Sequence, residues 1–367
     1  MSLTKAKCVY CGELIEVESA EPASICSYCG KPFVTEAAID NYNASANKTS
    51  DTIIDREIEA DFEIHDDILV KYKGKSLDVV VPKGIRIIAG DCFARQPIRS
   101  VRLPEGIVKL GSKSAALGVF SNCTRLKKVN LPKSLKIISD STFSGCTSLE
   151  DITLPDGLLE IGSHAFEGCK SFGCVIIPES VKVLKPYAFA RCYNLQKVII
   201  PAHMTKIESF LFFSCLKLTE INLHDGITHI ADNAFSGCIG FSRIHMPESL
   251  IEIGNFAFKG CTGLLSLQLP KNLKKLGNGA FYDCDRLRVV RLPRSLTKIG
   301  DEAFSECSGL DDVVYENPDI HIPDNTFDGC LGLKEKWRRA RLCPNCGGES
   351  SGFFAKVCPR CGTKTLL

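Results

Sequence analysis

A 23-residue repeat constrains the fold of this chain more than any other feature of its sequence. In this chain of 367 residues, ten cysteines lie 23 residues apart. A phenylalanine precedes each of them by three residues and therefore recurs at the same interval. The ten cysteines are Cys123, Cys146, Cys169, Cys192, Cys215, Cys238, Cys261, Cys284, Cys307 and Cys330. A fixed period of this length predicts a solenoid, because one unit cannot bury its own apolar side chains and must stack on its neighbours.

Each unit follows one pattern of apolar and turn residues, as in "LEDITLPDGLLEIGSHAFEGC" from Leu149 to Cys169. The alternation in "ITLP" predicts a short strand, and the proline ends it because proline has no amide proton to donate. The "AFxxC" segment predicts a tight turn or a single helical turn. With one longer unit that carries Phe93, the repeats predict about eleven coils over residues 83–333.

A cysteine near a histidine can be a catalytic nucleophile or a metal ligand, and Cys169 lies shortly after His164. A solenoid would instead place Cys169 in an interior row between Cys146 and Cys192, where a thiol behaves as a small apolar side chain. Disulfides between neighbours compete with this interpretation, since stacked strands lie about 4.8 Å apart. Free thiols are favoured for two reasons. The cysteine side chains of stacked coils should point in the same direction and not toward each other, and a reducing compartment keeps thiols reduced.

Eight further cysteines form CxxC pairs at the two ends of the chain. The pairs Cys8/Cys11 and Cys26/Cys29 lie near the start, and Cys343/Cys346 and Cys358/Cys361 lie near the end. Two such turns supply four thiolates to one tetrahedral ion and leave no open position for a reacting water. We therefore expect two structural zinc ions, in zinc ribbons over residues 1–35 and 343–367, with iron as the alternative metal.

Three connecting segments complete the organisation. Residues 36–60 are polar and acidic, which indicates a linker or short helix, and residues 61–82 are expected to form a β-hairpin cap. After the last coil, residues 334–342 are expected to form a basic helix that closes the solenoid with Trp337.

The repeats, with "LP", "IG", "AF" and "C" in register, resemble the BspA-like bacterial leucine-rich repeats over residues 80–333. The segment "DFEIHDDILVKYKGKSLDVVVP" resembles the hairpin that often opens such arrays, and the terminal modules resemble zinc ribbons. The resemblance implies a solenoid of short strands and tight turns. Many members of that family are secreted or displayed on the cell surface as adhesins, which is one alternative for this chain.

The strand of each coil should present an outward residue on the solenoid surface. In the central coils these residues are Thr153, Ile176, Ile199, Asn222 and His245. Exposed isoleucines on adjacent coils suit a protein or peptide partner, so these five positions form the predicted partner-binding surface. The alternative is that isoleucine serves strand pairing alone.

Sequence motifs for catalysis are absent. The chain has no GxSxG, GxxxxGK or HExxH motif and no complete GxGxxG. We therefore expect a non-enzymatic protein interaction scaffold. A nucleic-acid-associated protein is the second alternative, because residues 334–367 carry eight basic and two acidic side chains, including "KWRRAR". Without a signal peptide or an apolar span, we expect a cytoplasmic protein, or a surface protein if a native leader was removed.

Overall fold

The structure is a computed structural model of the whole chain. It describes residues 3–7, 13–18, 23–25, 32–34, 61–111, 116–150, 152–317, 319–339, 342–343, 345–348, 358 and 361. The chain divides into two compact units, Met1–Asp61 and Phe62–Leu367.

The first unit contains two antiparallel strand pairs. Strand β1 (Leu3–Lys7) pairs with β2 (Leu14–Glu18), and β3 (Ala23–Ile25) pairs with β4 (Pro32–Val34). The four cysteines predicted to bind the first zinc ion, Cys8, Cys11, Cys26 and Cys29, lie outside the described residues, as does the predicted linker over residues 36–60.

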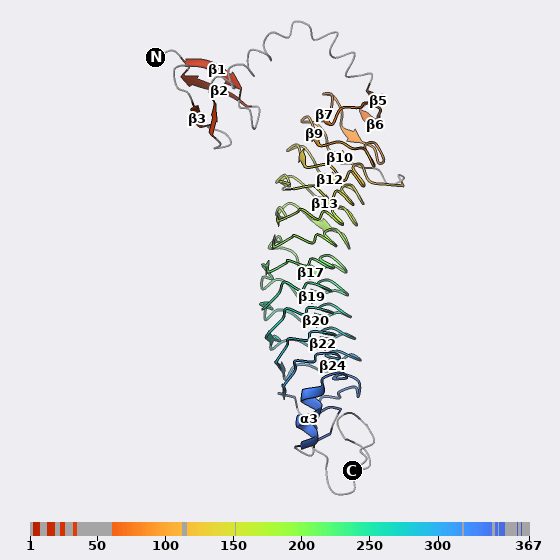
Figure 1. Ribbon diagram of the computed structural model, residues 1–367, viewed down its shortest axis with the longest axis vertical. Coiled ribbons are helices and arrows are strands. Elements are labelled where there is room, and N and C mark those ends of the chain that lie inside the picture. Colours follow the sequence, from red (N-terminus) through yellow and green to blue (C-terminus); the bar gives the residue numbers. More distant parts are fainter. Residues whose placement is uncertain are drawn as a thin grey trace. The chain divides into compact units, whose positions relative to one another are not determined.

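The second unit is a solenoid of about eleven turns with little helix, which confirms the solenoid part of the predicted fold class (Figure 1). Its coils stack so that strands from successive coils lie side by side and run parallel. Two rows of strands run along the solenoid, whereas the sequence predicted only the row at the "ITLP" positions. The second row comes from the "EIG" positions, where two-residue strands such as Glu160–Ile161 are too short to show an alternating pattern.

The first strand row contains β7 (Asp78–Val80), β9 (Ser100–Arg102), β11 (Lys128–Asn130), β14 (Cys174–Ile176), β16 (Lys197–Ile199), β18 (Glu220–Ile221), β21 (Leu267–Gln268), β23 (Val289–Leu292) and β25 (Asp312–Tyr315). The second strand row contains β8 (Ile87–Ile88), β10 (Lys109–Leu110), β12 (Ile137–Ile138), β13 (Glu160–Ile161), β15 (Val183–Leu184), β17 (Lys206–Ile207), β19 (His229–Ile230), β20 (Glu252–Ile253), β22 (Lys275–Leu276) and β24 (Lys298–Ile299).

Different elements close the two ends of the solenoid. At the start, β5 (Phe62–His65) and β6 (Ile68–Tyr72) form an antiparallel hairpin, and β6 continues the second row by pairing with β8. At the other end lies the helix α3 (Leu331–Arg339), which begins three residues before the predicted range and buries Leu333 and Trp337. In the described part of the chain, no helix is both long and apolar enough to cross a membrane.

A column of stacked phenylalanine rings fills the interior. From Phe93 to Phe327, neighbouring rings in successive coils have centroids 5.1 to 6.0 Å apart and planes within 15° of parallel. Tyr72 extends the column at its start, and Trp337 meets Phe327 edge-on at its end. Stacking therefore continues from the hairpin to the capping helix, and both ends of the column are covered by aromatic side chains.

Each repeat cysteine is fully buried beside this column. The thiol of Cys169 donates to the carbonyl oxygen of Phe143 in the preceding coil, with Sγ and O 3.3 Å apart. The other nine make the equivalent contact at 2.9 to 3.4 Å. The same Phe143 oxygen accepts the Cys146 amide, so the thiol uses the second lone pair of that carbonyl.

The residues two positions before and two positions after most ladder phenylalanines adopt left-handed backbone conformations; Phe120 and Phe327 have such a residue only on the following side. Around Phe166, His164 has φ 57° and Gly168 has φ 71°. Bulky residues rarely adopt this conformation, yet Tyr187 and Phe210 do so at the position of His164. Their rings stack at 4.4 Å on the outside of the coils, and His164 stacks on Tyr187 at 4.5 Å, which offsets the backbone cost.

The second strand row is interrupted between β15 and β17. The coil that contains β17 carries Leu211 at a position where the other coils have alanine, threonine, valine or cysteine. Leu211 is buried, and the ring separation at this coil, between Phe189 and Phe212, is the largest of the column at 6.0 Å. We attribute the interruption to the extra volume of this side chain in a closely packed interior.

The first strand row is interrupted after β18. No backbone hydrogen bond joins residues 219–222 to residues 242–245, all of which the structure describes. Arg243 forms only an isolated bridge with Ser266 on its other side. This coil carries Phe241 where most coils have leucine, and Phe241 is buried against Phe235 with an edge-on ring contact. We attribute the interruption of the first strand row to the larger ring of Phe241.

We expect Phe241→Leu to close the first strand row. Amide hydrogen exchange of residues 242–245 should slow by about tenfold or more, because paired amides exchange only after local opening. The exchange of β23 (Val289–Leu292), which pairs with a strand on each side, provides an internal reference. Unchanged exchange in the variant would show that Phe241 does not cause the interruption.

The repeat thiols should not react with alkylating reagents in the folded protein. Burial raises the pKa of Cys169 well above its usual value, so almost no reactive thiolate is present near neutral pH. Cys174 is exposed on β14 and should be alkylated first. Peptide-resolved mass spectrometry after brief alkylation should find label on Cys174, and label on the ten repeat cysteines only after denaturation. Disulfides between repeat cysteines would contradict the structure.

Candidate functional site

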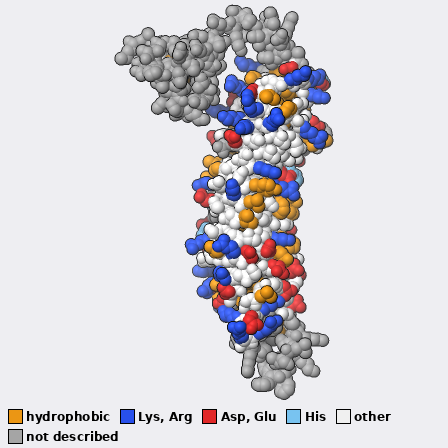
Figure 2. Space-filling view, viewed as in Figure 1, with side chains coloured by type: hydrophobic (Ala, Val, Ile, Leu, Met, Phe, Trp, Pro, Cys, Tyr) orange, Lys and Arg blue, Asp and Glu red, His pale blue; other side chains and the backbone are white. Residues whose placement is uncertain are grey.

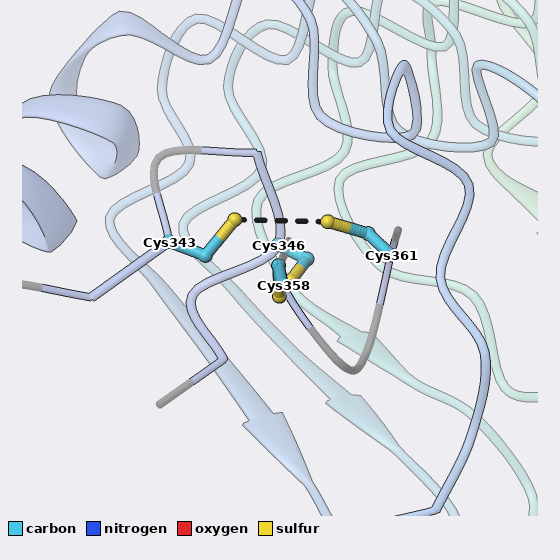
Figure 3. Close-up of side chains that lie close together, drawn as sticks. All are labelled: Cys343, Cys346, Cys358 and Cys361. Carbon is cyan, nitrogen blue, oxygen red and sulfur yellow. Dashed lines mark hydrogen bonds between the residues drawn. The ribbon is translucent and has the colours of Figure 1, made fainter. Parts of the chain in front are cut away.

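Four cysteines come together directly after α3 and the last coil. The sulfur atoms of Cys343, Cys346, Cys358 and Cys361 all lie within 4.8 Å of one another, and all four residues are buried (Figure 3). The Sγ atoms of Cys343 and Cys361 are 3.6 Å apart, and so are those of Cys346 and Cys358. The structure thus brings together the four residues that the sequence predicted for the second metal site.

The first CxxC turn has a backbone suited to directing two thiols to one point. The amide of Gly347 donates to the carbonyl of Cys343, and the amide of Cys343 donates to Gly348. Gly347 has φ 64°, and a β-carbon there would overlap the indole ring of Trp337. Glycine is therefore required at this position for two reasons, its conformation and the close approach of the ring.

The cluster is fastened to the solenoid by polar and aromatic contacts. The hydroxyl of Tyr315 in β25 donates to the carbonyl of Cys346 at 2.6 Å. Trp337 of α3 lies between Gly347 and the last ladder ring, Phe327. The cluster therefore packs directly against the element that covers the end of the interior column.

The donor set and spacing fit a tetrahedral metal ion. Zn–S bonds of about 2.3 Å place the sulfur atoms of a tetrahedral site about 3.8 Å apart, close to the two shortest separations here. Burial raises the pKa of Cys343 and Cys346, so without metal these thiols hold their protons. A dication would compensate the charge of four buried thiolates. Four protein ligands leave no position for substrate, so the site suits a structural ion.

The five predicted partner-binding residues lie on the outward face of the first strand row. Thr153, Asn222 and His245 are exposed, Ile176 is 59% exposed, and Ile199 is half-buried. Their placement agrees with the predicted strand orientation, and their role in binding stays a prediction.

Asn222 also has a structural role that the sequence did not indicate. Its side-chain oxygen accepts the Ile200 amide at 2.7 Å, and its nitrogen donates to the Ile200 carbonyl at 3.2 Å. Asn130 makes the same pair of bonds with Leu103 in an earlier coil. In both cases the side-chain amide replaces a backbone group and extends the ladder beyond the strand.

A cavity of about 540 Å³ opens where the first strand row is interrupted. We call it the strand-row cavity; it lies over β16, β18 and residues 241–245. Three predicted residues, Ile199, Asn222 and His245, line it, whereas Thr153 and Ile176 do not. Sequence reasoning missed Lys197, Glu220 and Arg243 as lining residues. Phe241, which departs from the repeat pattern, was the one available signal for the cavity.

The pairing of His164 with Cys169 is not a catalytic arrangement. His164 Nδ1 lies 2.7 Å from Glu167 on the outside of the coil, and its ring stacks on Tyr187. The Cys169 thiol is fully buried and directed to the carbonyl of Phe143. The His164 side chain therefore lies on the outside of the coil and the Cys169 side chain in its interior.

Comparison with known families supports the repeat assignment. The BspA type leucine rich repeat region matches in six copies, over residues 113–242 and 228–336. The chain belongs to the BspA-type leucine-rich repeat family. The predicted resemblance of the solenoid is thereby confirmed, while the N-terminal zinc ribbon stays a prediction.

Three solved structures of leucine-rich repeat proteins are similar to this chain. A leucine-rich repeat protein from Bacteroides ovatus is 32% identical, with 73% of this chain and 70% of that chain covered and a TM-score of 0.66. The leucine rich repeat protein of T. pallidum is 29% identical, over 49% of this chain and 86% of its own, with a TM-score of 0.45. A leucine rich cell surface protein from Faecalibacterium prausnitzii is 21% identical, over 70% and 92%, with a TM-score of 0.36. No curated protein matches the chain.

Zinc content measured by plasma mass spectrometry should test both predicted sites. We expect two zinc ions per chain, one from each set of four cysteines. Cys346→Ser should remove one ion, Cys11→Ser should remove the other, and the control Cys174→Ser should remove none. One ion that is lost only in Cys346→Ser would eliminate the N-terminal site, and one lost only in Cys11→Ser would eliminate the C-terminal site.

Proposed function

We propose that this BspA-type chain is a non-enzymatic interaction scaffold that binds a protein partner on the first strand row. The strand-row cavity is the observation that carries the proposal. It combines half-buried and buried aliphatic side chains with exposed polar ones on a rigid surface, as binding sites for peptides and small molecules do. Ile176, on the coil next to β16, adds an exposed apolar contact beside it.

Apolar side chains are also exposed on other parts of the solenoid. Figure 2 shows them gathered in the middle of the face in view, near the coils of β13 and β17, with charged side chains on both sides. Leu159 and Val183, next to and within the second strand row, are 42% and 43% exposed. These residues provide a matched comparison for the first strand row, because they have similar chemistry and no lining role in the cavity.

The charges of α3 favour a protein partner over a nucleic acid. Lys336 pairs with Asp312 at 2.9 Å, and Lys334 pairs with Asp328 at 2.5 Å. Glu335 accepts contacts from both Arg338 and Arg339. The lysine and arginine side chains of "KEKWRR" thus have acidic neighbours. Binding to a phosphate backbone instead depends on basic side chains that no acidic neighbour neutralises.

We propose that the C-terminal four-cysteine cluster holds a structural zinc ion and that the chain works in the cytoplasm. The closed donor set supports the metal. The location is supported by thiol chemistry, since a thiolate centre and an exposed thiol such as Cys174 are favoured in a reducing compartment.

Affinity capture from cell lysate, with half of the sample treated with nuclease, should test the scaffold. We expect a defined protein to survive nuclease and to bind Ile176→Asp/Ile199→Asp at least about tenfold more weakly, because each change puts a charge in an apolar contact. Leu159→Asp/Val183→Asp is the matched control and should bind normally. Captured material that disappears after nuclease treatment would contradict the scaffold and indicate nucleic-acid binding by the terminal modules.

A further inference from the structure

We propose that the strand-row cavity binds an extended acidic peptide segment, with a carboxylate of the peptide on the guanidinium of Arg243 and an aliphatic side chain on the cavity floor. This inference rests on the proposed protein-binding function and specifies the chemistry of the partner. Three properties of the cavity support it: backbone groups without ladder partners, an apolar floor, and an unpaired arginine.

The backbone groups come from the interruption of the first strand row. Between residues 219–222 and 242–245 no backbone hydrogen bond is formed. The Ile221 carbonyl accepts the Leu223 amide and the Ser242 carbonyl accepts the Leu265 amide, while the other main-chain groups at this gap lack the partner that a continuous strand row would give them. Such groups require partners, which water or a ligand must supply. A peptide main chain carries the matching donors and acceptors at strand spacing, whereas a phosphodiester backbone has no donors.

The floor of the cavity is apolar. Val198 is buried, Ile199, Ile221 and Ile244 are half-buried, and Phe241 closes the interior side. Because the interior column fixes these side chains from below, the floor is a preformed surface for one or two aliphatic side chains. A peptide that fills it gains about 25 cal/mol for each Å² of apolar surface removed from water.

The charges around the floor are not balanced. Lys197 and Glu220 neutralise each other through an ion pair of 2.9 Å. The guanidinium of Arg243 has no hydrogen bond or ion pair within the described part of the chain, and the residue is exposed. His245, on the same strand position as Ile199 and Asn222, adds a polar donor beside it. The cavity therefore favours an anion, and a carboxylate can accept two parallel bonds from the arginine.

One uncompensated arginine favours a peptide carboxylate over a nucleic acid. Binding to a phosphate backbone depends on several cations along its path. In the neighbouring coils of the first strand row, the position of Arg243 is held by Glu220 and Ser266. Arg243 is thus a single charge above an apolar floor, which matches an acidic residue next to an aliphatic one.

Selection from a random nonapeptide phage library on the full-length protein tests this inference. We expect the enriched peptides to contain aspartate or glutamate next to leucine, isoleucine or valine. Fluorescence anisotropy with synthetic copies should show roughly tenfold or greater weakening by Arg243→Glu. Replacing the peptide's acidic residue with lysine should restore binding to that variant. Phe241→Leu, which is expected to close the cavity, should also weaken binding.

Arg291→Glu is the matched control, because Arg291 is exposed on β23 of the same row and does not line the cavity. It should leave peptide affinity unchanged. Acidic peptides that bind Arg243→Glu as tightly as the unaltered protein would overturn the inference. Enriched peptides without acidic residues that still lose binding in Ile176→Asp/Ile199→Asp would also overturn it, while the strand-row scaffold would remain. Peptides insensitive to all of these variants would contradict both.

Discussion

The stacked phenylalanine column is the interaction on which the rest of this structure depends. Each ring contacts the rings of the coils before and after it, so coil spacing is set by the interior before any strand pairs. From β7 onward the strands have only two to four residues, too few to hold coils together through backbone bonds alone. The cysteine thiols then link each coil to the preceding phenylalanine carbonyl. Ring stacking and these thiol bonds therefore join the coils also where a strand row is interrupted.

Departures from the repeat pattern have consequences on the surface. Leu211 and Phe241 are larger than the usual residues at their positions, and both lie where a strand row is interrupted. The solenoid tolerates the extra volume because neighbouring coils remain joined through the phenylalanine column and the other strand row. At Phe241 the result is a cavity with an apolar floor and an unpaired arginine. A larger interior residue can thus accompany a cavity on the surface without any insertion in the chain.

The C-terminal four-cysteine cluster completes the solenoid instead of forming a separate module. Trp337 meets the last ring of the column on one side and Gly347 of the cluster on the other. Tyr315 joins the last strand of the first row to Cys346. A repeat array needs a terminal element that covers its exposed interior, and here the four-cysteine turn supports the helix that supplies this cover.

Much of the architecture could be predicted from the sequence, because a period kept by both Phe166 and Cys169 and their equivalents leaves only a stacked solenoid as a way to bury them. The CxxC spacing likewise indicated Cys343, Cys346, Cys358 and Cys361 as one cluster. The second strand row could not be predicted, since two-residue strands carry no period. Only the tertiary structure decided the strand-row cavity, because the effect of Phe241 depends on contacts between coils, which are distant in sequence. The hydrogen bond of Asn222 with Ile200 and the unpaired state of Arg243 also depend on contacts between coils, so only the tertiary structure showed them.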